Sequence, residues 1–437
     1  MEDKIEINEE KNGENQKNQG INVDDTKKEE DENNNLDARN INITNDSNIE
    51  NKNKETQEKD EEINFINQSI SEEEQFKILS LVKDYFSGPN KDNTNEIKDI
   101  SYSKWINKNV NIKKLCTAYE VSYLDDNSIN STSQKQNNFN NPFGKVSNHD
   151  FECELKLLKW ITEDNEHKKE FFKIKEENSN FLEINRYNDI IPYEYNITPI
   201  NPNNNNKNDI NNYINASYIK HPIKNESNLF IATQCPLDST ISSFWKMIYN
   251  HKIKLIVMLS SSSEEELGKN KIYWPKNNKC PLHLEKENLK IELLSKEIIA
   301  PNAMYLTKLK INNELEVKHL HILCWPEFGL PHDEFLATVI IEKIMVHINE
   351  QIKDDKSAPT VVHCSSGVGR TGTLIAICNI IICLESLLKI NKPPILCVFN
   401  VVRKLREQRY SMVTDKDQYK FIYDFSIYWI KKYYLKK

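Results

Sequence analysis

Cys364 and Arg370 stand at the two ends of a short loop. A cysteine can act as a nucleophile, and an arginine can bind phosphate. The loop follows a β-branched run at 360–362 and precedes an apolar stretch at 374–388. A strand–loop–helix of this kind directs backbone N–H groups and a helix N-terminus into one small cavity, which binds anions. Such a field stabilises a thiolate, and the planar arginine side chain can hold two phosphate oxygens. These residues predict phosphoryl transfer through a phosphocysteine.

His363 precedes the cysteine and Thr371 follows the arginine, and this longer pattern resembles the signature of protein tyrosine phosphatases. The resemblance covers roughly residues 150 to 437 and implies an α/β fold with a highly twisted mixed β-sheet flanked by helices. It implies that Cys364 is the nucleophile and that Arg370 binds the phosphate. We call the segment from Cys364 to Arg370 the phosphate loop. Its residues that would contact the phosphate oxygens are Ser365, Ser366, Gly367, Val368 and Gly369.

The same loop contains a second pattern, because Gly367, Gly369 and Gly372 match the G-x-G-x-x-G motif of dinucleotide-binding folds. That motif alone is weak evidence, and it requires neither the cysteine nor the arginine. A dinucleotide fold also predicts repeating strand–helix–strand units early in a domain, whereas this loop comes late. We therefore favour the phosphate interpretation, and we expect neither a cofactor nor a metal ion, since Arg370 and the loop amides supply the positive field.

Two further segments match the family in its own order. Tyr187 and Asp189 correspond to a substrate-recognition loop, in which the tyrosine stacks on the phosphotyrosine ring and the aspartate accepts hydrogen bonds from the peptide backbone. Trp325-Pro326-Glu327 resembles the mobile loop that supplies the general acid. The usual acid of the family is aspartate. The extra methylene of Glu327 moves the carboxyl group by about 1 Å, and such a misplacement can reduce the rate about 10²-fold.

A second departure from the family pattern lies near the C-terminus. The family has glutamines at the positions of Thr414 and Gln418. The first glutamine usually positions the water that hydrolyses the phosphocysteine, and a threonine side chain is shorter. The resemblance therefore implies that Gln418 takes over part of this role and that the slow step shifts toward hydrolysis of the phosphoenzyme.

The remaining site residues have supporting roles in the family. Glu264 is expected to pair with the signature arginine, Lys269 to contact the acid loop, and Arg409 to brace the phosphate loop. His363 is expected to orient that loop by hydrogen bonding and not to act as a general base. Thr371 is expected to donate a hydrogen bond to the cysteine sulfur.

The elements that must position these residues can be predicted from apolar spacing. Helical patterns alternate with short β-like runs, which predicts an α/β domain with a mixed sheet. The β-like runs lie at 213–219, 229–233, 255–259, 306–309, 319–323 and 360–362.

A separate amphipathic helix is predicted at residues 71–86, where Ser71 and Glu74 could form a capping box. We expect this helix to pack on the catalytic domain or to bind a partner. Its predicted apolar face comprises Phe76, Leu79, Val82 and Phe86.

Acidic residues are concentrated at the N-terminus. Residues 1–65 carry 20 Asp or Glu and 9 Lys or Arg, a net charge of −11, whereas the remainder carries 49 basic and 46 acidic residues. The first 65 residues are also nearly free of aromatics, so we expect a disordered tail. The near-neutral remainder gives no electrostatic basis for nucleic-acid binding. We predict that the chain after residue 65 consists of a helical extension at 66–125, a polar linker at 126–149 and the catalytic domain at 150–437.

Cysteine usage and hydropathy indicate the compartment. Nine cysteines are scattered without a C-x-x-C pair, which argues against structural zinc. No apolar N-terminal stretch is present, so we expect no signal peptide and a cytoplasmic protein. The longest apolar run, 374–384, is interrupted by Asn379 and is shorter than a membrane span. We expect a buried helix behind the phosphate loop.

Two rival functions remain open. The departures at Glu327 and Thr414 fit a pseudophosphatase, a module that binds phosphotyrosine but has little or no turnover. A dual-specificity or phosphoinositide phosphatase would need basic residues between Cys364 and Arg370 for a polyanionic substrate, and the loop has none. Tyr187 also favours a deep cleft whose base phosphoserine does not reach. We therefore predict a hydrolase that acts on phosphotyrosine-containing proteins.

Overall fold

The computed structural model describes residues 70–87, 119–120, 151–159, 181–204, 209–224, 227–331, 333–353 and 358–434. The predicted tail at 1–65 and the predicted linker at 126–149 lie outside the described residues. The elements described below all belong to one unit, Ser69–Lys437.

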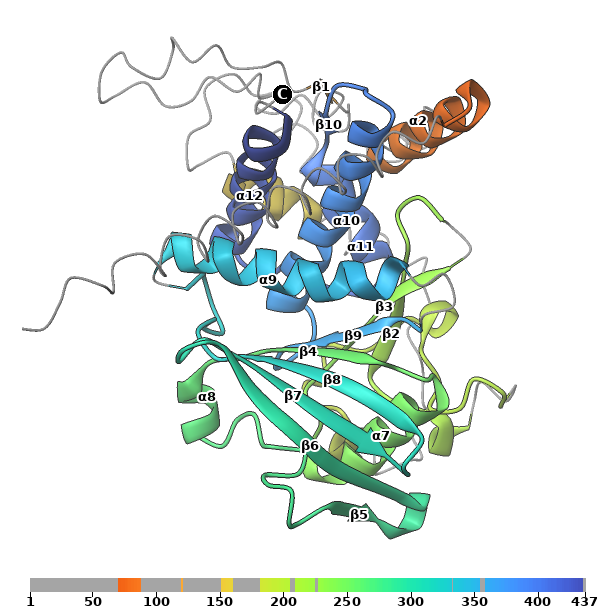
Figure 1. The fold of residues 1–437 in the computed structure, drawn as a ribbon, viewed down its shortest axis with the longest axis vertical. Coiled ribbons are helices and arrows are strands. Elements are labelled where there is room, and N and C mark those ends of the chain that lie inside the picture. The colour runs from red at the N-terminus through yellow and green to blue at the C-terminus, as the bar shows by residue number, and fades with distance from the viewer. Residues whose placement is uncertain are drawn as a thin grey trace, which may run out of the picture. The chain divides into compact units, whose positions relative to one another are not determined.

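An eight-stranded mixed sheet forms the centre of this unit, in the order β2-β3-β9-β4-β8-β7-β6-β5 (Figure 1). Four adjacent strands, β3, β9, β4 and β8, run parallel to one another, and all other neighbouring pairs are antiparallel. The mixed sheet predicted from the sequence is thereby confirmed. The strands are β2 (Ala216–Lys220), β3 (Asn228–Thr233), β4 (Leu255–Leu259), β5 (Leu282–Leu284), β6 (Leu289–Ala300), β7 (Met304–Ile311), β8 (Leu315–Ile322) and β9 (Thr360–His363).

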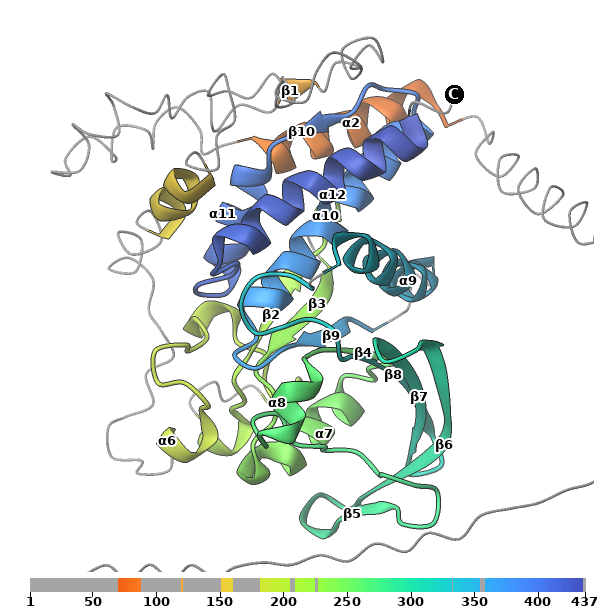
Figure 2. The same cartoon turned by 90° about the vertical axis from the view of Figure 1, so that its left-hand side faces the viewer.

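Strand β4, in the middle of the parallel part of the sheet, is apolar at every position because both faces of the sheet are covered there. Along β4, Leu255, Val257 and Leu259 join one buried cluster, while Ile256 and Met258 join a second cluster. Successive side chains of a strand point to opposite faces, so a continuous apolar run is buried on both sides. The first cluster contains residues of α9 to α12, and the second contains residues of α7, so these helices lie on opposite faces (Figure 2).

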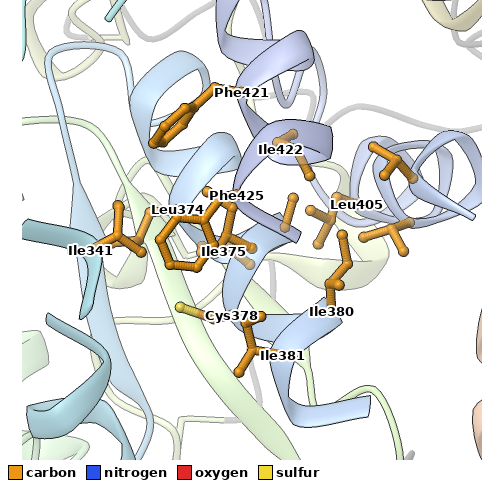
Figure 3. Close-up of a cluster of buried hydrophobic side chains, with 14 of the residues drawn as sticks. Ile341, Leu374, Ile375, Cys378, Ile380, Ile381, Leu405, Phe421, Ile422 and Phe425 are labelled. Atoms are coloured by element: carbon orange, nitrogen blue, oxygen red, sulfur yellow. The ribbon is translucent and has the colours of Figure 1, made fainter. Parts of the chain in front are cut away.

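The longest helix of the domain, α10, begins directly at the phosphate loop. Its side chains interleave with Ile341 of α9, Leu405 of α11, and Phe421 and Phe425 of α12 (Figure 3). Among the described helices it alone is long and apolar enough to span a membrane, but 83% of its most apolar window is buried inside the protein. It is therefore the buried core helix predicted behind the loop.

The other helices frame this core. One helix occupies residues 151–159. The remaining helices are α2 (Glu72–Phe86), α6 (Phe181–Ile184), α7 (Ile241–Asn250), α8 (Ser262–Glu266), α9 (Glu334–Lys353), α10 (Gly369–Lys389), α11 (Val398–Gln408) and α12 (Lys416–Tyr434).

The helix predicted before the catalytic domain is present as α2, and the Glu74 N–H donates to Ser71 Oγ at 3.2 Å. The predicted apolar face is only partly correct. Val82 and Phe86 are buried, as expected, but Phe76 is 75% exposed. The reason is that α2 buries its C-terminal half against α10 and α11, where Tyr85 is also buried.

Polar side chains of α10 and α11 bind the C-terminal end of α2. Asn379 donates to the Tyr85 hydroxyl at 2.9 Å, and Asn400 donates to the Phe86 carbonyl at 2.9 Å. Lys404 donates to the Tyr85 carbonyl at 2.7 Å. The bonds from Asn400 and Lys404 satisfy carbonyl groups that a helix end leaves without intrahelical partners. Beside them, β1 (Tyr119–Glu120) pairs antiparallel with β10 (Ile395–Leu396).

Candidate active site

The carboxyl ends of the four parallel strands meet at one edge of the sheet, and the loop after each strand contributes to the candidate site. β3 leads into residues 234–237, β9 into 364–368, β4 into 260–269 and β8 into 323–331. Ligands of open α/β sheets bind at this edge. The sheet thus brings together four loops that are distant in sequence.

Cys364 follows β9, and its side chain is only 3% exposed. The Gly367 N–H donates to the cysteine sulfur at 3.3 Å. Burial alone would raise the pKa of the Cys364 thiol, but the charge of Arg370 and the donors of Thr371 and Gly367 outweigh burial and lower the pKa below its ordinary value. The Thr371 hydroxyl has no other hydrogen-bond partner among the described residues. The loop therefore favours a thiolate, which is the nucleophilic form of cysteine.

Arg370 lies in the first turn of α10 and is buried. Its Nη1 donates to Glu264 Oε2 at 2.5 Å and to the Trp325 carbonyl at 2.9 Å, and its Nη2 donates to Glu264 Oε1 at 2.7 Å. A guanidinium group has five N–H donors, so these contacts leave the Nε–H and one Nη2–H. Two adjacent donors of this kind match two oxygens of a phosphate group.

Glu264 is held rigidly on the short helix α8. The Ser261 side chain caps α8, and both the backbone N–H and the hydroxyl of Ser261 donate to Glu264 Oε2, at 2.9 and 3.0 Å. Asn270 donates to Glu264 Oε1 at 3.0 Å. Burial alone would raise the pKa of Glu264, but Arg370 and Ser261 lower it, so the carboxylate stays ionised beside Arg370. The structure thus places Glu264 in a bidentate ion pair with the signature arginine.

The loop after β8 carries the predicted acid. Trp325 is buried, its backbone N–H donates to the Ser260 carbonyl at 3.1 Å, and its indole N–H donates to the Gly329 carbonyl at 3.1 Å. These bonds fix the base of the loop. Glu327 is partly exposed, and one of its carboxylate oxygens lies 3.4 Å from Lys269 Nζ. The structure therefore brings Glu327 and Lys269 together across two loops.

The predicted recognition loop lies against the phosphate loop. The Tyr187 hydroxyl lies 3.0 Å from Ser365 Oγ, and Asp189 is exposed. The neighbouring Arg186 directly precedes Tyr187 and was not among the predicted site residues. Arg186 fixes the recognition loop by donating to three carbonyl groups, those of Cys235, Pro236 and Lys269.

Arg409 is fully buried behind the phosphate loop. Its Nε donates to the Gly367 carbonyl at 2.9 Å, and its Nη2 donates to the Ser366 carbonyl at 3.1 Å. The same Nη2 donates to Asn215 Oδ1 at 2.8 Å, and Asn215 donates to Asn185 Oδ1 at 2.9 Å. This polar network joins the phosphate loop to the recognition loop, and its asparagines were not among the predicted site residues.

The two positions that correspond to the family's glutamines lie together beside Gly369. A Cβ atom on Gly369 would lie 2.8 Å from Thr414 Oγ1 and 3.2 Å from Gln418 Oε1. Asp415 caps the start of α12 by accepting from the Gln418 backbone N–H at 3.2 Å. The side-chain amide of Gln418 is buried, and neither of its polar atoms has a hydrogen-bond partner among the described residues. A buried amide of this kind can bind a water molecule.

Replacement of Gly367 by alanine is expected to destabilise the protein by at least about 3 kcal/mol. Gly367 has a φ of +74°, and an added Cβ atom would lie 2.1 Å from the Thr233 carbonyl oxygen. Gly268 is the matched control, since its φ is +67° but nothing lies within 4 Å of an added Cβ atom. We expect Gly268→Ala to destabilise the protein by only about 1 kcal/mol. Urea unfolding of both variants would measure the difference, and equal losses would contradict the predicted clash.

The sequence profile described as protein-tyrosine phosphatase matches residues 181–428. This chain belongs to the protein-tyrosine phosphatase family. The phosphatase segment contains every site residue described above, from Tyr187 to Gln418. Among the described residues, no group of three or more His, Cys, Asp or Glu side chains is placed to hold a metal ion.

Known phosphatases resemble this chain in sequence and fold. Tyrosine-protein phosphatase non-receptor type 20 of Rattus norvegicus is 32% identical over 245 residues, which cover 55% of this chain and 52% of the relative. Receptor-type tyrosine-protein phosphatase C of Homo sapiens is 35% identical over 258 residues, which cover 58% of this chain and 18% of the relative.

Solved structures show the same fold. The catalytic domain of human protein tyrosine phosphatase non-receptor type 18 superposes with a TM-score of 0.53 at 24% identity, covering 64% of this chain and 96% of that one. This chain spans about half the length of non-receptor type 20.

Proposed function

We propose that this chain hydrolyses phosphotyrosine in proteins through a covalent phosphocysteine on Cys364. One observation carries the proposal: a buried cysteine with a lowered pKa shares one loop with Arg370, and two N–H donors of that arginine remain after its contacts with the protein. This arrangement combines a nucleophile with a fixed positive field for the phosphate oxygens.

In the first step, the Cys364 thiolate attacks phosphorus, and the bond from phosphorus to the tyrosine oxygen breaks. Arg370 and the loop N–H groups hold the three equatorial oxygens and stabilise the charge of the transition state. Glu327 gives its proton to the leaving oxygen, so that tyrosine leaves as a neutral phenol. Glu327 lies 3.4 Å from Lys269 and interacts electrostatically with Arg370, which supports a position of the acid near the phosphate site.

In the second step, water attacks the phosphocysteine and the thiolate leaves. Glu327, now ionised, accepts the proton of the water, and inorganic phosphate departs. The buried amide of Gln418 supports a role in holding this water, because it has no protein partner among the described residues. Thr371 stabilises the departing thiolate. The shorter Thr414 side chain makes this step the slower one.

Tyr187 supports phosphotyrosine as the substrate class. Its hydroxyl contacts Ser365 of the phosphate loop, so its ring forms a wall beside the nucleophile. An aromatic wall can stack on a substrate ring. Asp189 is exposed beside it and can accept hydrogen bonds from a peptide backbone.

The second candidate function is a phosphotyrosine-binding module with weak turnover. Glutamate at position 327 and threonine at position 414 favour it, since they change the acid and the water-positioning group while the phosphate loop stays intact. Both candidates predict phosphopeptide binding, and only the first predicts sustained phosphate release.

The deciding experiment measures phosphate release from a phosphotyrosyl peptide by the native chain and by Cys364→Ser. Under our proposal the native chain turns over many times and Cys364→Ser shows no release. Peptide binding without release by either protein would instead establish the binding module. Faster release from a phosphoseryl peptide or a phosphoinositide than from the phosphotyrosyl peptide would exclude the proposed specificity.

A further inference from the structure

A relay of three hydrogen bonds runs behind the phosphate loop and ends on the main chain of Cys364. The Tyr273 hydroxyl lies 2.8 Å from His319 Nε2 and 2.6 Å from His363 Nε2. His363 Nδ1 lies 3.2 Å from the carbonyl oxygen of Cys364. The Tyr273, His319 and His363 side chains are at most 2% exposed, so these bonds do not compete with solvent.

The chemistry of the groups sets the direction of the relay. The Cys364 carbonyl only accepts, so His363 Nδ1 carries a proton. Burial lowers the pKa of His363 to about 3, so the ring is neutral and its Nε2 carries no proton. That Nε2 must therefore accept from the Tyr273 hydroxyl. Tyr273 has a single proton, so its oxygen must accept from the Nε2–H of His319.

The reverse direction is unfavourable at both ends. It would put the lone pair of His363 Nδ1 against the Cys364 carbonyl oxygen. It would also put a proton on His319 Nδ1, a buried atom that has no hydrogen-bond partner among the described residues. A buried donor without a partner costs about 1–3 kcal/mol. Burial also lowers the pKa of His319 well below its ordinary value, so His319 carries only one ring proton, which lies on Nε2.

We propose that His319 is a positioning residue for the phosphate loop, because its Nε2–H sets the direction of the relay that holds the Cys364 carbonyl. The inference rests on the proposed function of Cys364. The peptide unit that carries this carbonyl has its N–H, on Ser365, pointing the opposite way, away from His363. A hydrogen-bonded carbonyl strengthens the N–H donor of the same unit. His319 thereby strengthens the field that stabilises the Cys364 thiolate.

The test measures the thiol pKa of Cys364 in the full chain from the pH dependence of its alkylation by iodoacetamide, with the modified peptide identified by mass spectrometry. This measurement needs no turnover. We expect His319→Leu to raise the thiol pKa by about half to one pH unit, which slows alkylation about 3–10-fold at low pH. His319→Gln retains an N–H donor of similar reach and is expected to keep a near-native value.

A double-mutant cycle separates the relay from simple packing. Tyr273→Phe is expected to raise the thiol pKa as His319→Leu does, and the double variant is expected to add nothing further. His251 is the matched control. This partly buried histidine lies 2.8 Å from the Pro199 carbonyl and outside the relay, so His251→Leu is expected to leave the thiol pKa unchanged.

Three results would overturn the inference: a native thiol pKa in a folded His319→Leu, a shift in His319→Gln as large as in His319→Leu, or additive shifts in the double variant. If His319→Leu does not fold, nitrogen NMR of the native chain decides. We expect the ring proton on Nδ1 of His363 and on Nε2 of His319, and the opposite tautomers would overturn the relay. Absence of phosphate release would refute the proposed function without affecting these measurements.

Discussion

Replacement of Glu327 by glutamine is expected to slow phosphate release from a phosphotyrosyl peptide by about 10²–10⁴-fold. Glutamine keeps the size and reach of the side chain but has no proton to give to the leaving oxygen. The contact between Glu327 and Lys269 links only two side chains, and the base of the loop is held by Trp325. The variant should therefore fold and bind the peptide normally.

The measurement compares two substrates in steady state. With an aryl phosphate whose phenol is strongly acidic, the leaving group needs less help from an acid, so we expect a much smaller loss. Glu316→Gln serves as the control, because Glu316 is exposed on β8 and pairs with Lys310. This variant should release phosphate from both substrates at the native rate. Equal losses on both substrates would argue against Glu327 as the acid.

The conservative variant Glu327→Asp separates the two candidate functions. If the native glutamate is well placed, shortening it leaves turnover unchanged or lowers it, and this is the result we expect. A gain of about 10²-fold would mean that the extra methylene misplaces the native carboxyl group, which would favour the weakly active binding module.

Replacement of Glu264 by glutamine is expected to destabilise the protein by about 3–5 kcal/mol. Glu264 and Arg370 are buried and form a bidentate pair, so the variant leaves the Arg370 charge without compensation. Turnover should also fall, because Arg370 loses the partner that orients its remaining N–H donors. Urea unfolding would measure the loss of stability.

The matched control and the pH dependence sharpen this prediction. Glu350 pairs with Lys318 at the exposed surface, and Glu350→Gln is expected to change stability by at most about 1 kcal/mol. The pKa of Glu264 is lowered in the folded protein. Its contribution to the free energy of unfolding is therefore complete above the ordinary glutamate pKa of about 4.3, and this contribution declines as the pH falls below that value. A stability difference that grows on acidification would contradict an ionised Glu264.

The two strands of the eight-stranded sheet that are buried at every position, β4 and β9, were predicted from the sequence to within one residue. Residues 255–259 were predicted and form β4, and the run at 360–362 is extended by one residue in β9. In contrast, β6 (Leu289–Ala300) was not predicted. Only its first residues are buried, and its second half is exposed and mixes charged with apolar side chains, so it lacks a continuous apolar run.

By itself, the sequence determined the phosphate loop, because a strand, five loop residues and a helix are contiguous and their local geometry creates the anion site. The family resemblance added Glu264, Glu327 and Arg409 as expected partners. Their roles in catalysis remain predictions, although the structure places Glu264 and Arg409 against the loop.

Only the tertiary structure decided which buried polar groups meet behind the loop. His319 and His363 belong to strands on either side of β4, and the register of β4 places Ile256 beside His319 and Met258 beside His363. Strand order and register depend on packing across the whole sheet, and no local pattern encodes them. Tyr273 can bridge the two histidines only after that register is set. The loop chemistry is therefore local, whereas the network that orients it is tertiary.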